Sequence, residues 1–254
     1  LVKYTLREPR ISQCDEKDNL SVVVPKPLQL TLMQTFRILW QQQTYRHVVI
    51  AFTLLYFFSY GVAQWVPALL MRTHGIGTGE LGSWYALIWG VGGAFGTYVG
   101  GVLATKYYSN NEFTQLRIMA IILIAFIPLY LGIYLIDNKY VVFALMMVSA
   151  VIYCSIFGPI FALIQDLVPA EFRSMSVAIV LLFSNLFGMG LGPLFVGMLS
   201  DLGASIFGAE SLRYALVVWT PGYLWASYHL YRASQTVEAD ILEKDISIEK
   251  LNAL

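Results

Sequence analysis

The stretch HVVIAFTLLYFFSYGVAQWVPALL, residues 47–70, contains no Asp, Glu, Lys or Arg. About 20 apolar residues in an α-helix cross a hydrocarbon core of about 30 Å. Inside lipid each backbone amide must be satisfied within its own segment, which favours a helix. Five further stretches with almost no charge follow, at residues 81–104, 116–136, 140–165, 174–199 and 213–231. The sequence therefore predicts an all-α membrane protein with six transmembrane helices.

The placement of charge predicts the orientation in the membrane. If the residues before the first span lie in the cytoplasm, 13 of the 16 Lys and Arg residues lie on that side. Only Arg72, Lys139 and Arg213 lie on the other side. Cytoplasmic loops carry the excess of Lys and Arg, so we expect an integral multi-pass protein with both ends in the cytoplasm.

Two segments lie outside the predicted span region, which we place at residues 47–232. Residues 1–46 are expected to form a cytoplasmic linker that contains an amphipathic helix at about 28–43. Its apolar side chains Leu28, Leu32, Phe36 and Leu39 recur at helical spacing, which is typical of a helix at the membrane interface or one that binds a partner. Residues 233–254 carry five acidic side chains and are expected to form a solvated, acidic cytoplasmic tail.

The second and fifth spans resemble each other when the chain is shifted by 96 residues. Gly92 then aligns with Gly188, Gly96 with Gly192, and residues 101–105 with residues 197–201. An offset of three helices places the two copies in opposite orientations, which predicts the 3+3 inverted repeat of secondary transporters. The same glycines would also allow neighbouring helices to pack closely, whatever the protein binds.

The middle of each span lacks Asp, Glu, Lys, Arg and His, and polar and aromatic residues stand there instead. We expect these to form a substrate cavity that suits an amphipathic molecule. The candidate cavity residues are Tyr56, Tyr60, Gln64, Trp89, Tyr153, Phe157 and Asn185. Interfacial anchoring and core packing are the alternative roles for each of them.

Two further groups of residues are candidates for gating. Gly158-Pro159 and Gly192-Pro193 interrupt the backbone hydrogen bonds of their helices, so they are candidate hinges. Asp166 or Glu171 could pair with Arg173 in the turn after the fourth span and hold a cytoplasmic gate closed.

The order of these motifs resembles the carboxy-terminal half of a major facilitator superfamily transporter of the bacterial spinster-like branch. The resemblance rests on residues 6–10, 72–82, 158–173, 185–201 and 207–216. It implies a twelve-helix fold whose amino-terminal six-helix half is missing from this chain, and a bacterial inner membrane. It also implies that the cavity walls are the first, second, fourth and fifth spans, with the third and sixth facing lipid. The resemblance further implies lipid-like substrates, and proton-linked acidic residues in the other half of the transporter.

The leading hypothesis is thus half of a secondary active transporter that moves a small, amphipathic or lipid-like molecule by alternating access. The alternatives are a six-span oligomeric channel and a membrane adaptor without transport. An enzyme is not expected, because no His lies at mid-span beside a nucleophile. We expect no catalytic residue, no metal, no cofactor and no nucleic-acid partner; the expected partners are the other half, the bilayer and the substrate.

Overall fold

The computed structural model describes residues 32–106, 111–169 and 172–252, and all regular structure in them is helical. Residues 1–31, with the start of the expected amphipathic helix, and Glu171 of the expected gate lie outside the described residues. The helices are α3 (Leu32–Gln41), α4 (Gln43–His74), α5 (Thr78–Leu87), α6 (Gly93–Lys106), α7 (Glu112–Leu135), α8 (Lys139–Asp166), α9 (Arg173–Phe183), α10 (Gly190–Phe207), α11 (Ser211–Trp219) and α12 (Tyr223–Asn252). Single π-helical turns at Ile88–Gly92 and Ser184–Met189 join α5 to α6 and α9 to α10.

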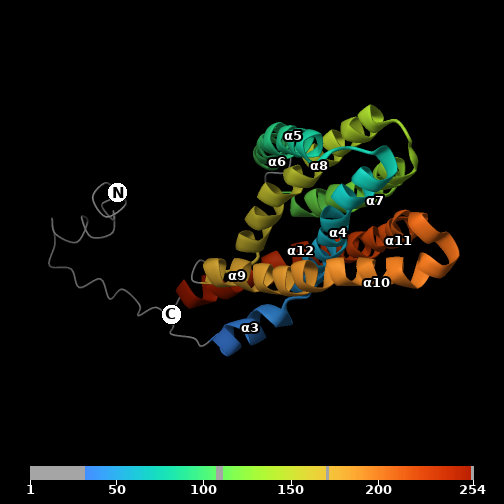
Figure 1. Cartoon of the computed structure of the whole chain (residues 1–254). Coiled ribbons are helices and arrows are strands. Elements are labelled where there is room, and N and C mark those ends of the chain that lie inside the picture. The colour runs from blue at the N-terminus through green and yellow to red at the C-terminus, as the bar shows by residue number, and fades with distance from the viewer. Residues whose placement is uncertain (1–31, 107–110, 170–171, 253–254) are drawn as a thin grey trace, which may run out of the picture.

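These elements make six long helical rods: α4, α5–α6, α7, α8, α9–α10 and α11–α12 (Figure 1). Five continuous helical segments are long and apolar enough to cross a membrane, and the fifth, residues 173–243, contains two of the rods. It folds back at Gly208, whose φ of 54° is the left-handed conformation that glycine adopts without strain. The six predicted transmembrane helices are therefore confirmed, and each rod begins before the predicted apolar stretch.

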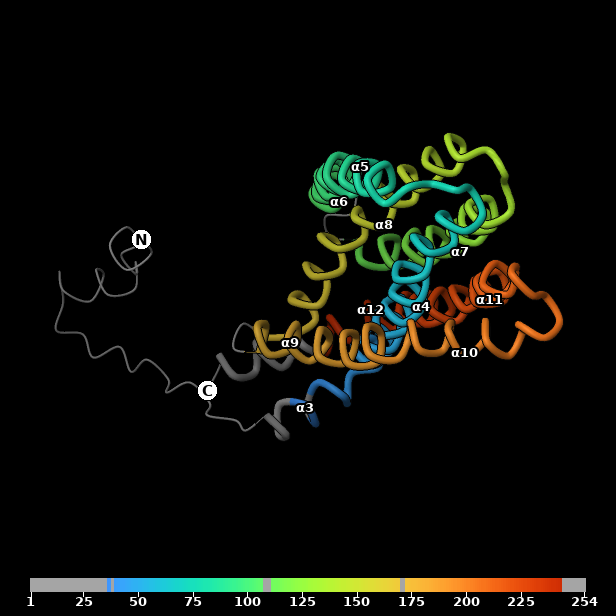
Figure 2. Tube along the Cα trace, in the orientation of Figure 1, coloured from blue at the N-terminus to red at the C-terminus, as the bar shows by residue number. Residues whose placement is uncertain are grey.

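The inverted repeat is visible in the helix geometry. The two π-helical turns begin at Ile88 and Ser184, and 184 − 88 gives the same offset of 96 residues found in the sequence. A methyl group added at Gly96 would overlap the Val151 carbonyl of α8, and one at Gly192 would overlap the Phe57 carbonyl of α4. The second rod thus packs on the fourth as the fifth packs on the first. Figure 2 shows the α9–α10 rod crossing α4.

The predicted solvated tail is wrong for its first two turns. Helix α12 continues from the membrane region through this segment, and Ala233, Ser234 and Val237 are buried. Asp240 accepts a 2.7 Å hydrogen bond from the backbone amide of Thr44 in α4. An apolar stripe at helical spacing lies among the acidic residues. This stripe packs against α4, as the preceding turns of α12 do.

The described part of the expected amphipathic helix is helical and packs on the bundle. In α3, Leu39 is buried, and the Phe36 ring lies 6.0 Å from the Phe183 ring of α9. The Gln42 amide after α3 donates a 3.1 Å hydrogen bond to the Leu167 carbonyl. Its apolar face therefore has a partner within the same chain.

Candidate functional site

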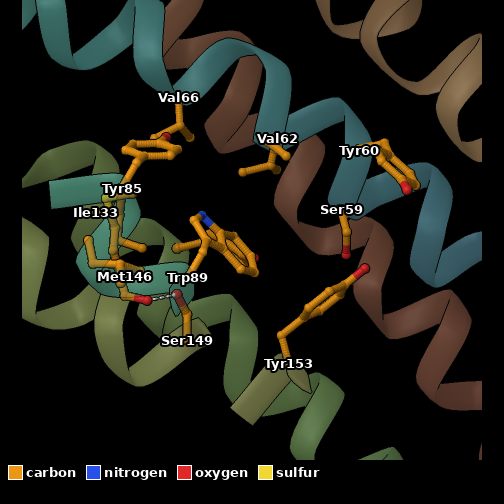
Figure 3. A pocket seen from close by; sticks show the side chains of 13 residues that line it. Ser59, Tyr60, Val62, Val66, Tyr85, Trp89, Ile133, Met146, Ser149 and Tyr153 are labelled. Carbon is orange, nitrogen blue, oxygen red and sulfur yellow. Dashed lines mark hydrogen bonds between the residues drawn. The ribbon is translucent and has the colours of Figure 1, made fainter. Parts of the chain in front are cut away.

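A cavity of about 260 Å³ lies between four rods of the bundle. Its walls come from α4, from α5 with the π-helical turn, from α7 and from α8 (Figure 3). The lining residues are Ser59, Tyr60, Val62, Ala63, Val66, Tyr85, Ile88, Trp89, Tyr130, Ile133, Met146, Ser149 and Tyr153. The volume is near the lower end of that of small-molecule sites, which lie at about 300–1,000 Å³.

One edge of the cavity carries hydroxyl groups. Figure 3 shows the hydroxyls of Ser59 and Tyr153 pointing toward one another. The Ser59 hydroxyl also lies 3.2 Å from the hydroxyl of Tyr223, which is fully buried behind it. Ser149, by contrast, donates to the Met146 carbonyl of its own helix at 2.9 Å. The Ser59 and Tyr153 hydroxyls are therefore the candidate hydrogen-bonding groups at this edge.

The other walls are aromatic. Trp89 lies in the π-helical turn, and its ring meets Tyr153 edge to face at 6.1 Å between centroids. A π-helical turn adds one residue to the helical turn and so changes the direction of the side chains around it. Tyr130 is held from behind by Tyr223, with the rings stacked at 5.5 Å and 8°. Rigid aromatic faces of this kind bind apolar groups with little loss of conformational freedom.

No Asp, Glu, Lys, Arg or His is among the residues that line the cavity. Within the described part of the chain, no three His, Cys, Asp or Glu residues are grouped closely enough to hold a metal ion. The site can therefore select a ligand by shape, aromatic contact and hydroxyl hydrogen bonds, and its own walls provide no opposite charge for an ionic group.

The predicted cavity residues fall into three groups. Tyr60, Trp89 and Tyr153 line the cavity. Tyr56 and Phe157 lie just outside it, with Tyr56 at 5.4 Å from Tyr60 and Phe157 at 5.0 Å from Tyr153.

The two predicted amides lie elsewhere. Gln64 and Asn185 are exposed on the surface of this chain and do not line the cavity. The Asn185 amide donates a 2.8 Å hydrogen bond to the Leu181 carbonyl of its own rod.

The third rod contributes residues that the sequence analysis missed. Tyr130 and Ile133 of α7 line the cavity, whereas no residue of α9 or α10 does. The resemblance implied the fifth span as a wall and a lipid-facing third span, so this cavity differs from that expectation. A signal was present, because Tyr130 and Tyr134 stand four residues apart in an otherwise apolar span. Ser59 and Tyr85 were also missed; Ser59 is adjacent to the candidate Tyr60, and Tyr85 stands four residues before the candidate Trp89.

A sequence profile of the Major Facilitator Superfamily matches residues 2–193, well over half of the chain. The chain belongs to the Major Facilitator Superfamily. It is 30% identical over 187 residues to an MFS-type efflux pump of Mycolicibacterium smegmatis, a match that covers 73% of this chain and 43% of that protein.

Two crystal structures of a bacterial homologue of the human lysosomal transporter Spinster share the fold. The inward-facing, occupied structure matches 78% of this chain and 50% of its own, with a TM-score of 0.65 and 22% identity. The inward-facing, unoccupied structure matches 89% and 53%, with a TM-score of 0.71 and 22% identity. The chain thus spans about half the length of these relatives, and it forms a six-helix bundle of the superfamily fold.

At both candidate hinges of this superfamily bundle, a side chain of a neighbouring helix donates a hydrogen bond to a proline carbonyl. Helix α8 passes through Gly158-Pro159 without interruption, and the buried Gln115 amide of α7 donates a 2.7 Å hydrogen bond to the Pro159 carbonyl. The Trp65 indole N–H of α4 donates a 2.8 Å hydrogen bond to the Pro193 carbonyl, one residue after Gly192.

The candidate gate lies at the other end of the bundle from the Lys139–Glu80 ion pair. Asp166 is the last residue of α8 and Arg173 the first of α9. The Arg173 Nε donates a 3.2 Å hydrogen bond to the Gln165 carbonyl across the turn. The turn between α8 and α9 is thus bridged by the arginine side chain.

Proposed function

We propose that this chain is half of a membrane transporter that moves a small amphipathic molecule by alternating access, and that the cavity is its share of the substrate site. One observation carries the proposal: the cavity combines a hydroxyl edge, at Ser59 and Tyr153, with aromatic walls and no charge. The hydroxyls suit a polar head and the rings of Trp89, Tyr85 and Tyr130 suit an apolar body. Membership of a superfamily with an efflux pump among its members supports transport.

The proposal includes an amino-terminal six-helix half as partner, because the relatives are about twice as long as this chain. We place both ends of the chain in the cytoplasm on the distribution of Lys and Arg. We place the protein in a bacterial inner membrane because the relatives it matches are bacterial. Since no Asp, Glu, Lys, Arg or His lines the cavity, the residue that couples transport to an ion gradient is proposed to lie in the other half.

The test is transport by the natural full-length protein in proteoliposomes. The probe is an uncharged alkyl glycoside with a fluorescent tail, and a radiolabelled hydrophilic sugar is the comparison. We expect uptake of the alkyl glycoside only. Ser59→Ala and Tyr153→Phe each remove a hydroxyl that lines the cavity, and we expect the KM to rise about two- to ten-fold, which corresponds to about 0.5–1.5 kcal/mol per hydrogen bond.

Ser149→Ala is the matched control, because it removes a hydroxyl from the same cavity that is already bonded within its own helix. We expect its KM to stay unchanged. Uptake of the sugar alone would contradict the amphipathic substrate. Flux that does not saturate with probe concentration would favour the channel, and the absence of any flux would favour the adaptor.

A further inference from the structure

A second concave site lies on the outside of the bundle, between α7 and α12. It is a groove of about 450 Å³. Its walls come from Arg117, Ile121 and Ile124 on α7 and from Leu224, Tyr228 and Tyr231 on α12. Both sets follow the spacing i, i+4, i+7, so each forms one stripe along its helix. The Ser227 hydroxyl at the base donates a 2.8 Å hydrogen bond to the Ala120 carbonyl, which closes the floor and leaves the groove wall apolar.

The groove and the cavity lie on opposite faces of α7. Ile121 and Ile124 line the groove, and Tyr130 and Ile133, each nine residues further on, line the cavity. Nine residues at about 100° each turn the helix by two and a half turns, which is half a turn from the starting face. The groove therefore faces away from the proposed substrate site, and its exposed apolar side chains face the lipid.

One end of the groove is positively charged. The Arg117 guanidinium carbon lies 4.2 Å from the centroid of the Phe113 ring and 5.6 Å from that of Tyr231. The ion pairs found among residues 32–106, 111–169 and 172–252 join Lys139 to Glu80 and Arg213 to Asp137 and Glu210, and Arg117 takes part in none of them. The rings hold the guanidinium by cation–π contact, and its N–H groups remain available for an anion.

Arg117 also lies at the right depth for a lipid headgroup. It is five residues from the start of α7 and 18 residues before Leu135 at the other end, and 18 residues rise about 27 Å, close to the thickness of the hydrocarbon core. Ile124 is then about 10 Å deeper than Arg117. Tyr228 and Tyr231 stand beside the arginine, as tyrosines do at the membrane interface.

We propose that this groove binds an anionic glycerophospholipid, with its phosphate on Arg117 and one acyl chain along Ile121, Ile124 and Leu224. Charge complementarity selects this occupant, because a guanidinium forms paired hydrogen bonds with a phosphate. Anionic lipids are also concentrated in the cytoplasmic leaflet, where the proposed orientation places Arg117.

The test is native mass spectrometry of the natural full-length protein in detergent, titrated with phosphatidylglycerol or with phosphatidylcholine of the same acyl chains. We expect a tightly retained phosphatidylglycerol and weaker phosphatidylcholine binding. Arg117→Gln should weaken phosphatidylglycerol binding about five-fold, the effect of one basic residue near an anionic surface, and Arg117→Lys should restore part of it. Ile124→Trp should reduce the binding of both lipids by filling the groove.

Lys106→Gln is the matched control, because this exposed lysine is at the same end of the bundle and outside the groove. It should bind phosphatidylglycerol as the unmodified protein does, and each variant should remain monodisperse. Equal retention of the two lipids, or unchanged binding by Arg117→Gln, would overturn the proposal. So would a dimer that Ile124→Trp dissociates, since a second copy of the chain would then occupy the groove.

Discussion

Thr44 and Asp240 are 196 residues apart in the chain and meet at one end of the bundle, where the Asp240 carboxylate accepts a 2.7 Å hydrogen bond from the Thr44 amide. The first amides of a helix have no partner within it. The residue before α4, Gln42, makes no capping bond with its side chain. A carboxylate from α12 thus supplies the cap and adds a favourable charge at the positive end of the helix dipole.

We expect Asp240→Ala to lower the free energy of unfolding by about 1 kcal/mol, the usual value of an N-terminal cap. Thermal unfolding of the full-length protein in detergent would measure it. Glu238→Ala, an exposed carboxylate two residues earlier on the same helix, should leave the transition unchanged. Equal shifts for the two variants would assign the effect to net charge.

Alanine substitutions at glycines inside and outside the contacts between rods are expected to change stability in opposite directions. Gly96→Ala and Gly192→Ala place a methyl group against a backbone carbonyl of the neighbouring rod, and we expect each to destabilise by about 1–3 kcal/mol. Gly101→Ala meets no atom within 4 Å and should stabilise slightly through its helix propensity. Denaturation of the three variants in parallel would measure their free energies of unfolding. Equal free energies for Gly96→Ala and Gly101→Ala would disprove the close contact at Gly96.

Gln115 holds α7 to the Pro159 carbonyl of α8 through a 2.7 Å hydrogen bond in a buried site. Gln115→Leu keeps the approximate size and removes the donor, so we expect a loss of about 1–3 kcal/mol from the unpaired carbonyl. The same change at Gln43, which is exposed at the start of α4, should cost less than about 0.5 kcal/mol. Comparable losses at both positions would show that this hydrogen bond adds nothing to stability.

If the turn after α8 forms a cytoplasmic gate, Asp166→Asn should move the population toward the inward-open state. The shift should be at most about five-fold, because an ion pair at the surface contributes about 0–1 kcal/mol. Accessibility of an engineered cysteine in the cytoplasmic half, measured with a membrane-impermeant reagent, would report it. Asp201→Asn, exposed on α10, is the control. An unchanged transport rate together with unchanged accessibility for Asp166→Asn would exclude the gate.

Much of the fold could be predicted from the sequence, because crossing lipid imposes length and apolarity on each rod. The repeat could be predicted as well, since Gly96, Gly188 and Gly192 lie against the main chain of a neighbouring rod, where a larger side chain would not fit. The packing of residues 233–240 could not be predicted, because the same helical turns carry both acidic residues, which indicate exposure to solvent, and the apolar residues that are buried. The share of α7 in the cavity was also missed. The spacing of Tyr130 and Tyr134 marks one face of this span, but it does not show which helices that face meets. The π-helical turns at Ile88–Gly92 and Ser184–Met189 were not predicted either.

Where Gly192 meets Phe57, the main chains of α10 and α4 touch without a side chain between them. If the rods tilt against one another in the proposed alternating access, this contact would be the fulcrum. From Gly192 to the end of α10 at Phe207 is 15 residues, a lever arm of about 22 Å. A tilt of about 10° would move that end by about 4 Å and leave the fulcrum in place. Ser59 and Tyr60 of the cavity stand two and three residues from Phe57. Under the proposed mechanism, the candidate site would therefore lie near the point that a tilt displaces least, and the largest displacement would occur at the ends of the bundle.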